Sequence, residues 1–225
     1  MTLGLFGGTF DPIHRGHLDV AEAAQRALGL DRIWFVPARV PPHRGSPRAS
    51  AAHRFAMTAL AIEDTAGLLV SDLDMDTPGP SYTSETLDRL AARGVNTREV
   101  CLIAGADAFL EITAWKDYPH LLDRCRFAVI SRPGASALSL PAALPALAAR
   151  MVAVPNDVGC RFETTPDVVS GIFLIDAPTA PVSSTDVRRA VAAGQPLADL
   201  VPPRVAAYIE RHGLYAPSTA PDGSL

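Results

Sequence analysis

Gly7 to His17 read GGTFDPIHRGH and follow a short apolar run, Leu3 to Phe6, that predicts a buried first strand. A glycine pair after a strand lets the backbone approach a ligand with no side chain in between. His14 and His17 lie at the entrance of a predicted helix, whose free N–H groups carry partial positive charge. The stretch therefore predicts a strand, an anion-binding loop and a helix, with a triphosphate as the expected ligand.

Short β-rich runs alternate with helical segments along the rest of the chain, which is typical of a parallel sheet covered by helices. The expected strands are 3–6, 32–36, 68–71, 100–104, 127–131, 151–154 and 171–175, and the expected helices are 17–28, 51–62, 84–92, 184–193 and 204–211. The most apolar strands lack alternation, as expected where both faces are buried. The fold class is therefore α/β, a single Rossmann-like, doubly wound parallel sheet with helices on both faces.

The composition fits one globular domain, expected over residues 1–215, with an Ala/Pro-rich loop at 136–145 and a disordered tail at 216–225. The chain has 225 residues, 48% hydrophobic and 20% charged, which is enough to bury a sizeable core. Because it has neither an apolar run of about 18 residues nor a basic leader, we expect no membrane span and no secretory signal. The net charge of −4 argues against a nucleic-acid partner.

The cysteines indicate the cellular compartment, and the scarcity of lysine indicates which groups bind phosphate. The three cysteines, Cys101, Cys125 and Cys160, have no metal-ligand spacing. Cys101 and Cys125 lie in apolar runs, which predicts buried free thiols in a reducing cytoplasm. Lys116 is the only lysine, against 19 arginines. Phosphate binding is therefore expected to fall to arginine, histidine and backbone amides.

Two loops that follow strands carry candidate ligand-binding residues. Residues 37–44 read PARVPPHR, where the prolines stiffen the loop and present His43 and Arg44 as a cationic pair. A solvated surface loop is the alternative, but the position beyond a strand's carboxyl end favours phosphate. Residues 74–83 read DMDTPGPSYT and precede a helix, so Ser81 or Thr83 is a candidate N-cap, and the helix start is a candidate site for a ligand carboxylate. The aspartates alone do not predict a metal site.

The segment after the fourth strand pairs a polar and an aromatic candidate. Gly105 ends that strand, and Asp107 is well placed just beyond it to accept hydrogen bonds from ribose hydroxyls. Trp115 follows a short helix and has two interpretations. It either fills the core or serves as a platform for a heterocycle.

A second helix start, at 181–189, reads PVSSTDVRR. Ser183 and Asp186 have the spacing of a capping box, with Asp in place of Glu. Capping is compatible with phosphate binding, because hydroxyls and N–H groups at a helix start, with Arg188 one turn further, form a second anion site.

These segments together resemble the bacterial nicotinate-nucleotide adenylyltransferases of the nucleotidyltransferase superfamily with the (H/T)xGH motif. The matching motifs are GGTFDPIHRGH, PPHR, PSYT, GADAF followed by Trp115, SRPG at 131–134, and VSSTDVR, over roughly residues 3 to 215. Arg44 stands where the family often has lysine, and Val182 and Val187 replace isoleucines, which keeps the charge and the apolar character.

The resemblance implies adenylyl transfer from ATP to nicotinate mononucleotide by in-line attack, without a covalent intermediate. The implied catalytic residues are His14, His17 and Arg188. The implied ATP contacts are Gly8, Thr9, Phe10, His14, His17, Gly105, Asp107, Ser183, Ser184, Thr185 and Arg188. The implied mononucleotide contacts are His43, Arg44, Thr83, Trp115 and Lys116, the last through its backbone N–H. Mg²⁺ is expected on the ATP phosphates, mostly through water, and a homo-oligomer is left open.

Three other functions compete with this interpretation. A pantetheine-phosphate adenylyltransferase shares the phosphate motifs, but PSYT and Trp115 speak against it. A regulator that has lost turnover is disfavoured by His14, His17 and Arg188. A class I tRNA synthetase uses the same phosphate-binding logic, but 225 residues leave no room for tRNA-binding domains.

Overall fold

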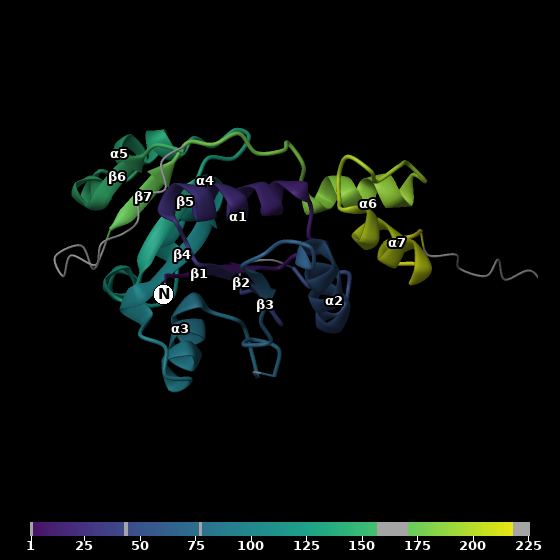
Figure 1. Cartoon of the computed structure of the whole chain (residues 1–225), viewed down its shortest axis with the longest axis horizontal. Helices are drawn as coiled ribbons and strands as arrows, with labels where there is room; N and C mark the ends of the chain where they lie inside the picture. The colour runs from purple at the N-terminus through teal and green to yellow at the C-terminus, as the bar shows by residue number, and fades with distance from the viewer. Residues whose placement is uncertain (1, 43–44, 77, 157–170, 218–225) are drawn as a thin grey trace, which may run out of the picture.

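The computed structural model describes residues 2–42, 45–76, 78–156 and 171–217, and its strands form one parallel sheet (Figure 1). Within these ranges the sheet has seven strands in the order β3-β2-β1-β4-β5-β7-β6. Their bounds are β1 Leu3–Gly8, β2 Arg32–Pro37, β3 Leu68–Val70, β4 Val100–Gly105, β5 Arg126–Ile130, β6 Met151–Val154 and β7 Ile172–Ile175. Each coincides with a predicted strand to within two residues at either end.

Helices cover both faces of the sheet, as the doubly wound prediction requires. Their bounds are α1 Arg15–Leu28, α2 Ala51–Ile62, α3 Thr83–Ala92, α4 Ala106–Phe109, α5 Leu140–Ala143, α6 Ser184–Ala192 and α7 Pro203–Arg211. Short 3₁₀ helices complete the described part of the chain, at η1 Thr97–Glu99, η2 Ile112–Ala114, η3 His120–Asp123, η4 Ala137–Ser139 and η5 Pro145–Arg150.

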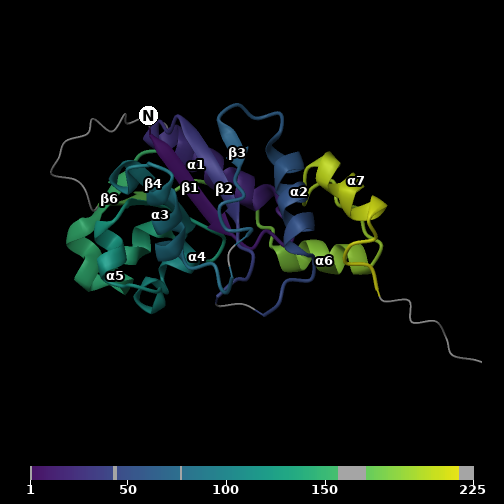
Figure 2. The same cartoon turned by 90° about the horizontal axis from the view of Figure 1, so that it is seen from below.

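Alternation along each strand divides the core into two halves. In β4, Cys101 and Ile103 pack with α1, α2, α6 and α7, whereas Val100 and Leu102 pack with α3, α4 and α5. Figure 1 shows α1 across one face and α3 on the other, and Figure 2 shows α2, α6 and α7 gathered at one end of the molecule. Apart from Arg126 at the start of β5, the β4 and β5 strands are apolar on both faces because both faces are covered.

Helix α1 begins two residues earlier than its apolar pattern predicts. His14 has an extended backbone and is the N-cap, so the helix starts at Arg15. The helix ends at Gly29, which adopts the left-handed conformation (φ 57°) that glycine accommodates without strain. His17 therefore lies in the first turn of α1, near the positive end of the helix dipole.

The prediction of a loop at 136–145 is wrong, because most of this stretch is helical. It contains η4 and α5, because Ala137 and Leu140 are buried in the core half beside α3 and anchor tight turns there. Pro141 lies in the first turn of α5, where its missing N–H removes no helical hydrogen bond. Of the predicted disordered tail, residues 218–225 lie outside the described residues.

Candidate active site

A cavity of about 900 Å³ opens beyond the carboxyl ends of β1, β2 and β4. Because β1 pairs with β2 on one side and with β4 on the other, the loops leaving these strands diverge around this point. Every predicted site residue in the described part of the chain lines the cavity: Gly8, Thr9, Phe10, His14, His17, Thr83, Gly105, Asp107, Trp115, Lys116, Ser183, Ser184, Thr185 and Arg188. His43 and Arg44 lie outside the described residues.

The two histidines of the loop after β1 lie face to face. Their ring centroids are 3.7 Å apart with an interplanar angle of 30°, and the Phe10 ring meets His17 edge-on at 5.0 Å. The backbone N–H of His14 donates to Nδ1 of His17 at 3.2 Å. Because Nδ1 accepts this bond, a neutral His17 ring carries its proton on Nε2, which makes Nε2 a hydrogen-bond donor.

His14 is uncharged when the cavity holds no anion. Its side chain is only 2% exposed. Burial, and then the positive charge of Arg132, lower the pKa of His14 to about 3, against the opposing effect of Asp186. Its Nδ1 is buried and has no hydrogen-bond partner within the described residues. Buried polar atoms are almost always paired, so an orphan atom at a cavity wall fits a site that is completed by a ligand.

Glycines allow close approach around this histidine. A Cβ at Gly16 would lie 2.9 Å from the Arg132 guanidinium and 3.0 Å from the Ala180 carbonyl oxygen. Arg132 donates to the carbonyl oxygen of Gly16 at 2.8 Å. A side chain at Gly16 would therefore crowd Arg132 and the Ala180 backbone, which gives packing a reason for a glycine directly before His17.

The predicted capping box at the start of α6 is confirmed. The same helix start is hydrogen-bonded to the loop after β1 through Ser184. The Asp186 N–H donates to Ser183 Oγ at 3.2 Å, and the Ser183 N–H donates to Asp186 Oδ2 at 3.0 Å. Ser184 Oγ donates to the Pro12 carbonyl oxygen at 2.9 Å. The hydroxyl proton of Ser184 is thus bonded to the loop, and its backbone N–H is the more suitable donor to a ligand.

Arg188 bridges the same two elements. Its Nη1 donates to the Asp11 carbonyl oxygen at 2.6 Å, and its Nη2 donates to Thr185 Oγ1 at 3.0 Å. The guanidinium is held on the cavity wall with donors to spare, because an arginine has five N–H groups. The start of α1 and the start of α6 consequently meet at one end of the cavity.

Asp11, which sequence reasoning left without a role, joins three distant segments. Its carboxylate accepts the N–H groups of Arg48 and Ala49 at 2.8 and 3.0 Å. It also accepts the hydroxyl of Tyr215 at 2.8 Å. Burial, and then the nearby Asp11, raise the pKa of Tyr215, so the phenol stays protonated and donates. Asp11 therefore anchors the loop after β1, which carries both histidines, to two other segments of the chain.

A second residue that sequence reasoning missed is Arg54 of α2, only 1% exposed. Its guanidinium donates to the carbonyl oxygens of Thr9, Arg39 and Ala49 at 2.6, 3.0 and 3.3 Å. These bonds hold the loops after β1 and β2 together. The signal was present in the sequence, because Arg54 lies three and four residues before Met57 and Thr58 on the buried face of α2.

The turn after β4 forms the wall assigned to the ribose. Gly105 is the N-cap of α4, and Asp107 lies in the first turn with its side chain exposed to the cavity. A Cβ at Gly105 would overlap the Asp107 carboxylate and lie 3.0 Å from Arg132. Gly105 thus allows Asp107 to take its place beside the cavity.

The opposite end of the cavity is formed by the start of α3 and by Trp115. Neither predicted N-cap is correct, since Tyr82 takes the N-cap position and Thr83 is the first helical residue. Ser81 Oγ accepts the Arg39 N–H instead, at 3.1 Å. Trp115 is half-buried, packs against the core and lines the cavity. Both interpretations of Trp115 are therefore compatible with its position.

The sequence is similar to a known protein family and to named proteins over most of its length. Residues 5–190 match the model of a family described as cytidylyltransferase-like. The chain is 42% identical to a "Probable nicotinate-nucleotide adenylyltransferase" of Roseiflexus sp. (strain RS-1), over 95% of this chain and 97% of that protein. It is 39% identical to a protein of the same name from Thermus thermophilus, over 96% of this chain and 100% of that protein.

Solved structures share the fold at lower sequence identity. A Plasmodium falciparum nicotinic acid mononucleotide adenylyltransferase complexed with NaAD superposes with a TM-score of 0.67 at 18% identity, over 95% of this chain and 97% of that chain. The same enzyme complexed with APC gives a TM-score of 0.65. At this identity the likeness establishes the arrangement of strands and helices, and the side chains of the site must be argued from this chain alone.

Proposed function

Since this chain belongs to the cytidylyltransferase-like family and, within it, to the nicotinate-nucleotide adenylyltransferases, we propose how its residues carry out that activity. The enzyme transfers the adenylyl group of ATP to nicotinate mononucleotide, which yields nicotinate adenine dinucleotide and pyrophosphate in NAD biosynthesis. The roles of individual residues below are proposals.

One observation carries the proposed site, namely that two helix starts, two histidines and Arg188 line the same cavity. The α1 and α6 starts place the positive ends of two helix dipoles at the cavity. His14 Nδ1 lacks a hydrogen-bond partner in the described structure, and Arg188 is fixed beside it on the wall. A triphosphate supplies the acceptors and the negative charge that such a wall requires.

In the proposed mechanism, a phosphate oxygen of nicotinate mononucleotide attacks the α-phosphorus of ATP in line. The bond from the α-phosphorus to the oxygen bridging to the β-phosphate breaks, and pyrophosphate leaves with the electron pair. The attacking phosphate is already anionic, so no general base is required. Catalysis then depends on positioning and on preorganised donors that match the charge developing on the leaving group, here His17 Nε2–H and Arg188.

The donor set of the cavity fits a metal ion carried by the nucleotide. No group of three or more His, Cys, Asp or Glu side chains suitable for a metal occurs within the described ranges. The carboxylate of Asp11 already accepts three hydrogen bonds. We therefore propose that Mg²⁺ would arrive bound to ATP rather than to side chains of the cavity and would neutralise phosphate charge there.

We further propose that Gly105 and Asp107 hold the ATP ribose and that Thr83, Trp115 and the Lys116 N–H hold the pyridine carboxylate and ring. The cytoplasm is the proposed compartment, and the free, buried thiols of Cys101 and Cys125 support it. No helix in the described part of the chain has the length and apolarity to cross a membrane.

The deciding experiment is pyrophosphate release from ATP and Mg²⁺ with nicotinate mononucleotide, nicotinamide mononucleotide or phosphopantetheine as acceptor. We expect the fastest release with nicotinate mononucleotide and a product with the mass of nicotinate adenine dinucleotide. Faster release with phosphopantetheine would replace the proposed acceptor, and binding of ATP without release by any acceptor would identify a regulator.

A further inference from the structure

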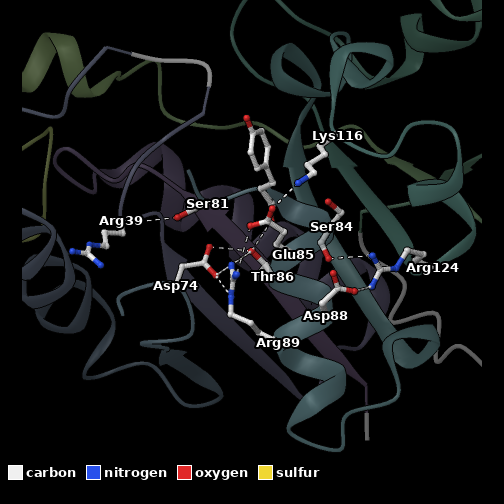
Figure 3. A network of polar contacts seen from close by, with 11 residues as sticks. Arg39, Asp74, Ser81, Ser84, Glu85, Thr86, Asp88, Arg89, Lys116 and Arg124 are labelled. Atoms are coloured by element: carbon white, nitrogen blue, oxygen red, sulfur yellow. Dashed lines mark hydrogen bonds and ion pairs between the residues drawn. The ribbon is translucent and has the colours of Figure 1, made fainter. Parts of the chain in front are cut away.

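Asp74, which follows β3, is buried beneath the first turns of α3 (Figure 3). It is 3% exposed. The Thr86 hydroxyl donates to its carboxylate, lying 3.1 and 3.0 Å from the two oxygens. Arg89 donates to Asp74 Oδ1 from both Nε, at 3.2 Å, and Nη2, at 2.5 Å. The buried Asp74 carboxylate is thus hydrogen-bonded to α3 at two positions on one face of the helix.

From Asp74 an ion-pair chain leads outward to the rim of the cavity. Arg89 Nη1 lies 3.9 Å from Glu85 Oε2, and Glu85 Oε1 accepts a hydrogen bond from Lys116 Nζ at 2.6 Å. The Lys116 ammonium also lies 4.8 Å from the centre of the Tyr82 ring. The ion-pair chain, made of Asp74, Arg89, Glu85 and Lys116, therefore connects the loop after β3, helix α3 and the segment after η2.

The helix is held from its other side as well. Arg124 donates to the carbonyl oxygen of Ser84 at 3.1 Å and to Asp88 at 2.6 Å. Just before the helix, Ser81 Oγ accepts the Arg39 N–H. The first turn of α3 is consequently fixed in direction, and its N–H groups, which have no partner within the helix, keep one orientation relative to the cavity.

Charge balance gives this arrangement a functional meaning. Negative and positive side chains alternate along the ion-pair chain, so the negative charges of Asp74 and Glu85 are each balanced by a neighbouring cation. Asp74 and Thr86 both line the cavity, at the end where Thr83 begins the helix. A carboxylate ligand arriving there meets the positive helix end, and the two carboxylates closest to that end in the ion-pair chain, Asp74 and Glu85, are each paired with a cation.

We infer that Asp74 is a positioning residue for acid selectivity, which acts through Thr86 and Arg89 to aim the first turn of α3 at the carboxylate of the mononucleotide. The inference rests on the proposed function, in which that turn receives the nicotinate carboxylate. A displacement of about 1 Å at such a site costs up to 10²-fold in rate. Loss of the Asp74 charge therefore affects the acid substrate and leaves the amide analogue, which has no carboxylate to place, largely unchanged.

The test compares Asp74→Asn with Asp72→Asn, a control that removes an exposed ion pair with Arg93 at the far end of the same helix. For each protein, kcat and KM are measured with nicotinate mononucleotide, nicotinamide mononucleotide and ATP. We expect Asp74→Asn to lower kcat/KM for the acid about 10-fold, mainly through KM, with KM for ATP and kcat/KM for the amide within about threefold. Asp72→Asn should leave all of these within about twofold.

If Asp74 had a merely structural role, Asp74→Asn would lower kcat/KM equally for the acid and the amide substrate. The acid-to-amide ratio of kcat/KM would then be unchanged, and that result overturns the inference. If Asp74→Asn does not fold, Arg89→Lys provides the same test, because it keeps the charge and loses the forked geometry. Asp74→Glu should restore most of the ratio. Failure of the unmodified enzyme to use nicotinate mononucleotide would refute the proposed function itself. Turnover without any acid preference would overturn only this inference.

Discussion

Tyr215 and Asp11 are 204 positions apart in the chain, and the Tyr215 hydroxyl donates a 2.8 Å hydrogen bond to Asp11 Oδ1 inside the protein. Through this bond the segment that follows α7 supports the loop that carries both histidines. A residue close to the end of the described chain thus supports a loop near its start that lines the cavity.

Tyr215→Phe should lower the free energy of unfolding by about 1.5–3 kcal/mol, because it removes a hydrogen bond to a charged, buried acceptor. Urea titration of Tyr215→Phe, Asp11→Asn and the double variant measures this directly. In the double variant the losses should be less than additive, since the two side chains share one bond. Fully additive losses would show that the pair is not coupled.

His14 should make the protein acid-sensitive over a defined pH window. Its pKa in the folded state, about 3, lies below the ordinary value of 6.5, so between these values the unfolded state binds more protons. Stability from neutral His14 is complete above pH 6.5 and is lost as the pH falls toward 3. Relative to His14→Gln, the unmodified protein should lose about 2 kcal/mol of unfolding free energy between pH 6.5 and 5. Parallel pH profiles would contradict the burial of a neutral ring.

His17→Ala should keep the fold and lose about 10²–10³-fold in kcat, because it removes one preorganised donor to the leaving phosphates. His120→Ala is the matched control, since His120 is exposed on η3 and does not line the cavity. The control should keep kcat within about twofold. A folded His17→Ala enzyme within about threefold of the parent would rule out the assignment.

Trp115→Ala should weaken nicotinate mononucleotide binding much more than ATP binding. Loss of a stacking platform costs on the order of 1–3 kcal/mol, or about 5–150-fold in affinity. Titration calorimetry with each substrate gives the two values, and Trp115→Phe, which keeps a flat ring, should recover part of the loss. Equal losses for both substrates, or unfolding, would favour the role of Trp115 in the core.

The unmodified enzyme should prefer nicotinate over nicotinamide mononucleotide by at least about 10²-fold in kcat/KM. The N–H groups at the start of α3 and the Thr83 hydroxyl can donate charge-assisted hydrogen bonds to the carboxylate, each worth about 1.5–3 kcal/mol. The measurement uses saturating ATP and Mg²⁺ with each acceptor in turn. Asp117 is the nearby carboxylate in sequence that could favour an amide, so equal values would direct attention to it.

Strand and helix positions were predictable because they depend on local patterns. Both faces of β5 are buried, and its residues 127–130 accordingly read as an unbroken apolar run after Arg126. The capping box of α6 was predictable for the same reason, since Ser183 and Asp186 contact each other within one turn. The starts of α1 and α3 were less accurate, because His14 and Tyr82 are unusual N-caps whose role depends on the surrounding loops.

Contacts between distant segments were not predictable. Nothing local indicates that Tyr215 bonds to Asp11 or that Arg132 donates to Gly16. The charge state of His14 also depends on burial, which only the assembled fold defines. The site residues were identifiable from motifs, whereas the residues that hold them in place were not.

Lys116 gives the cavity rim a further property. Its ammonium is hydrogen-bonded to Glu85, which raises the pKa of Lys116, and the chain has no other lysine. A reagent that acylates side-chain amines therefore has one target in this enzyme, and that target lines the cavity beside Trp115. A sequence that relies on arginine for its positive charge has thereby left a unique chemical handle where a fluorophore would sense the arrival of substrate.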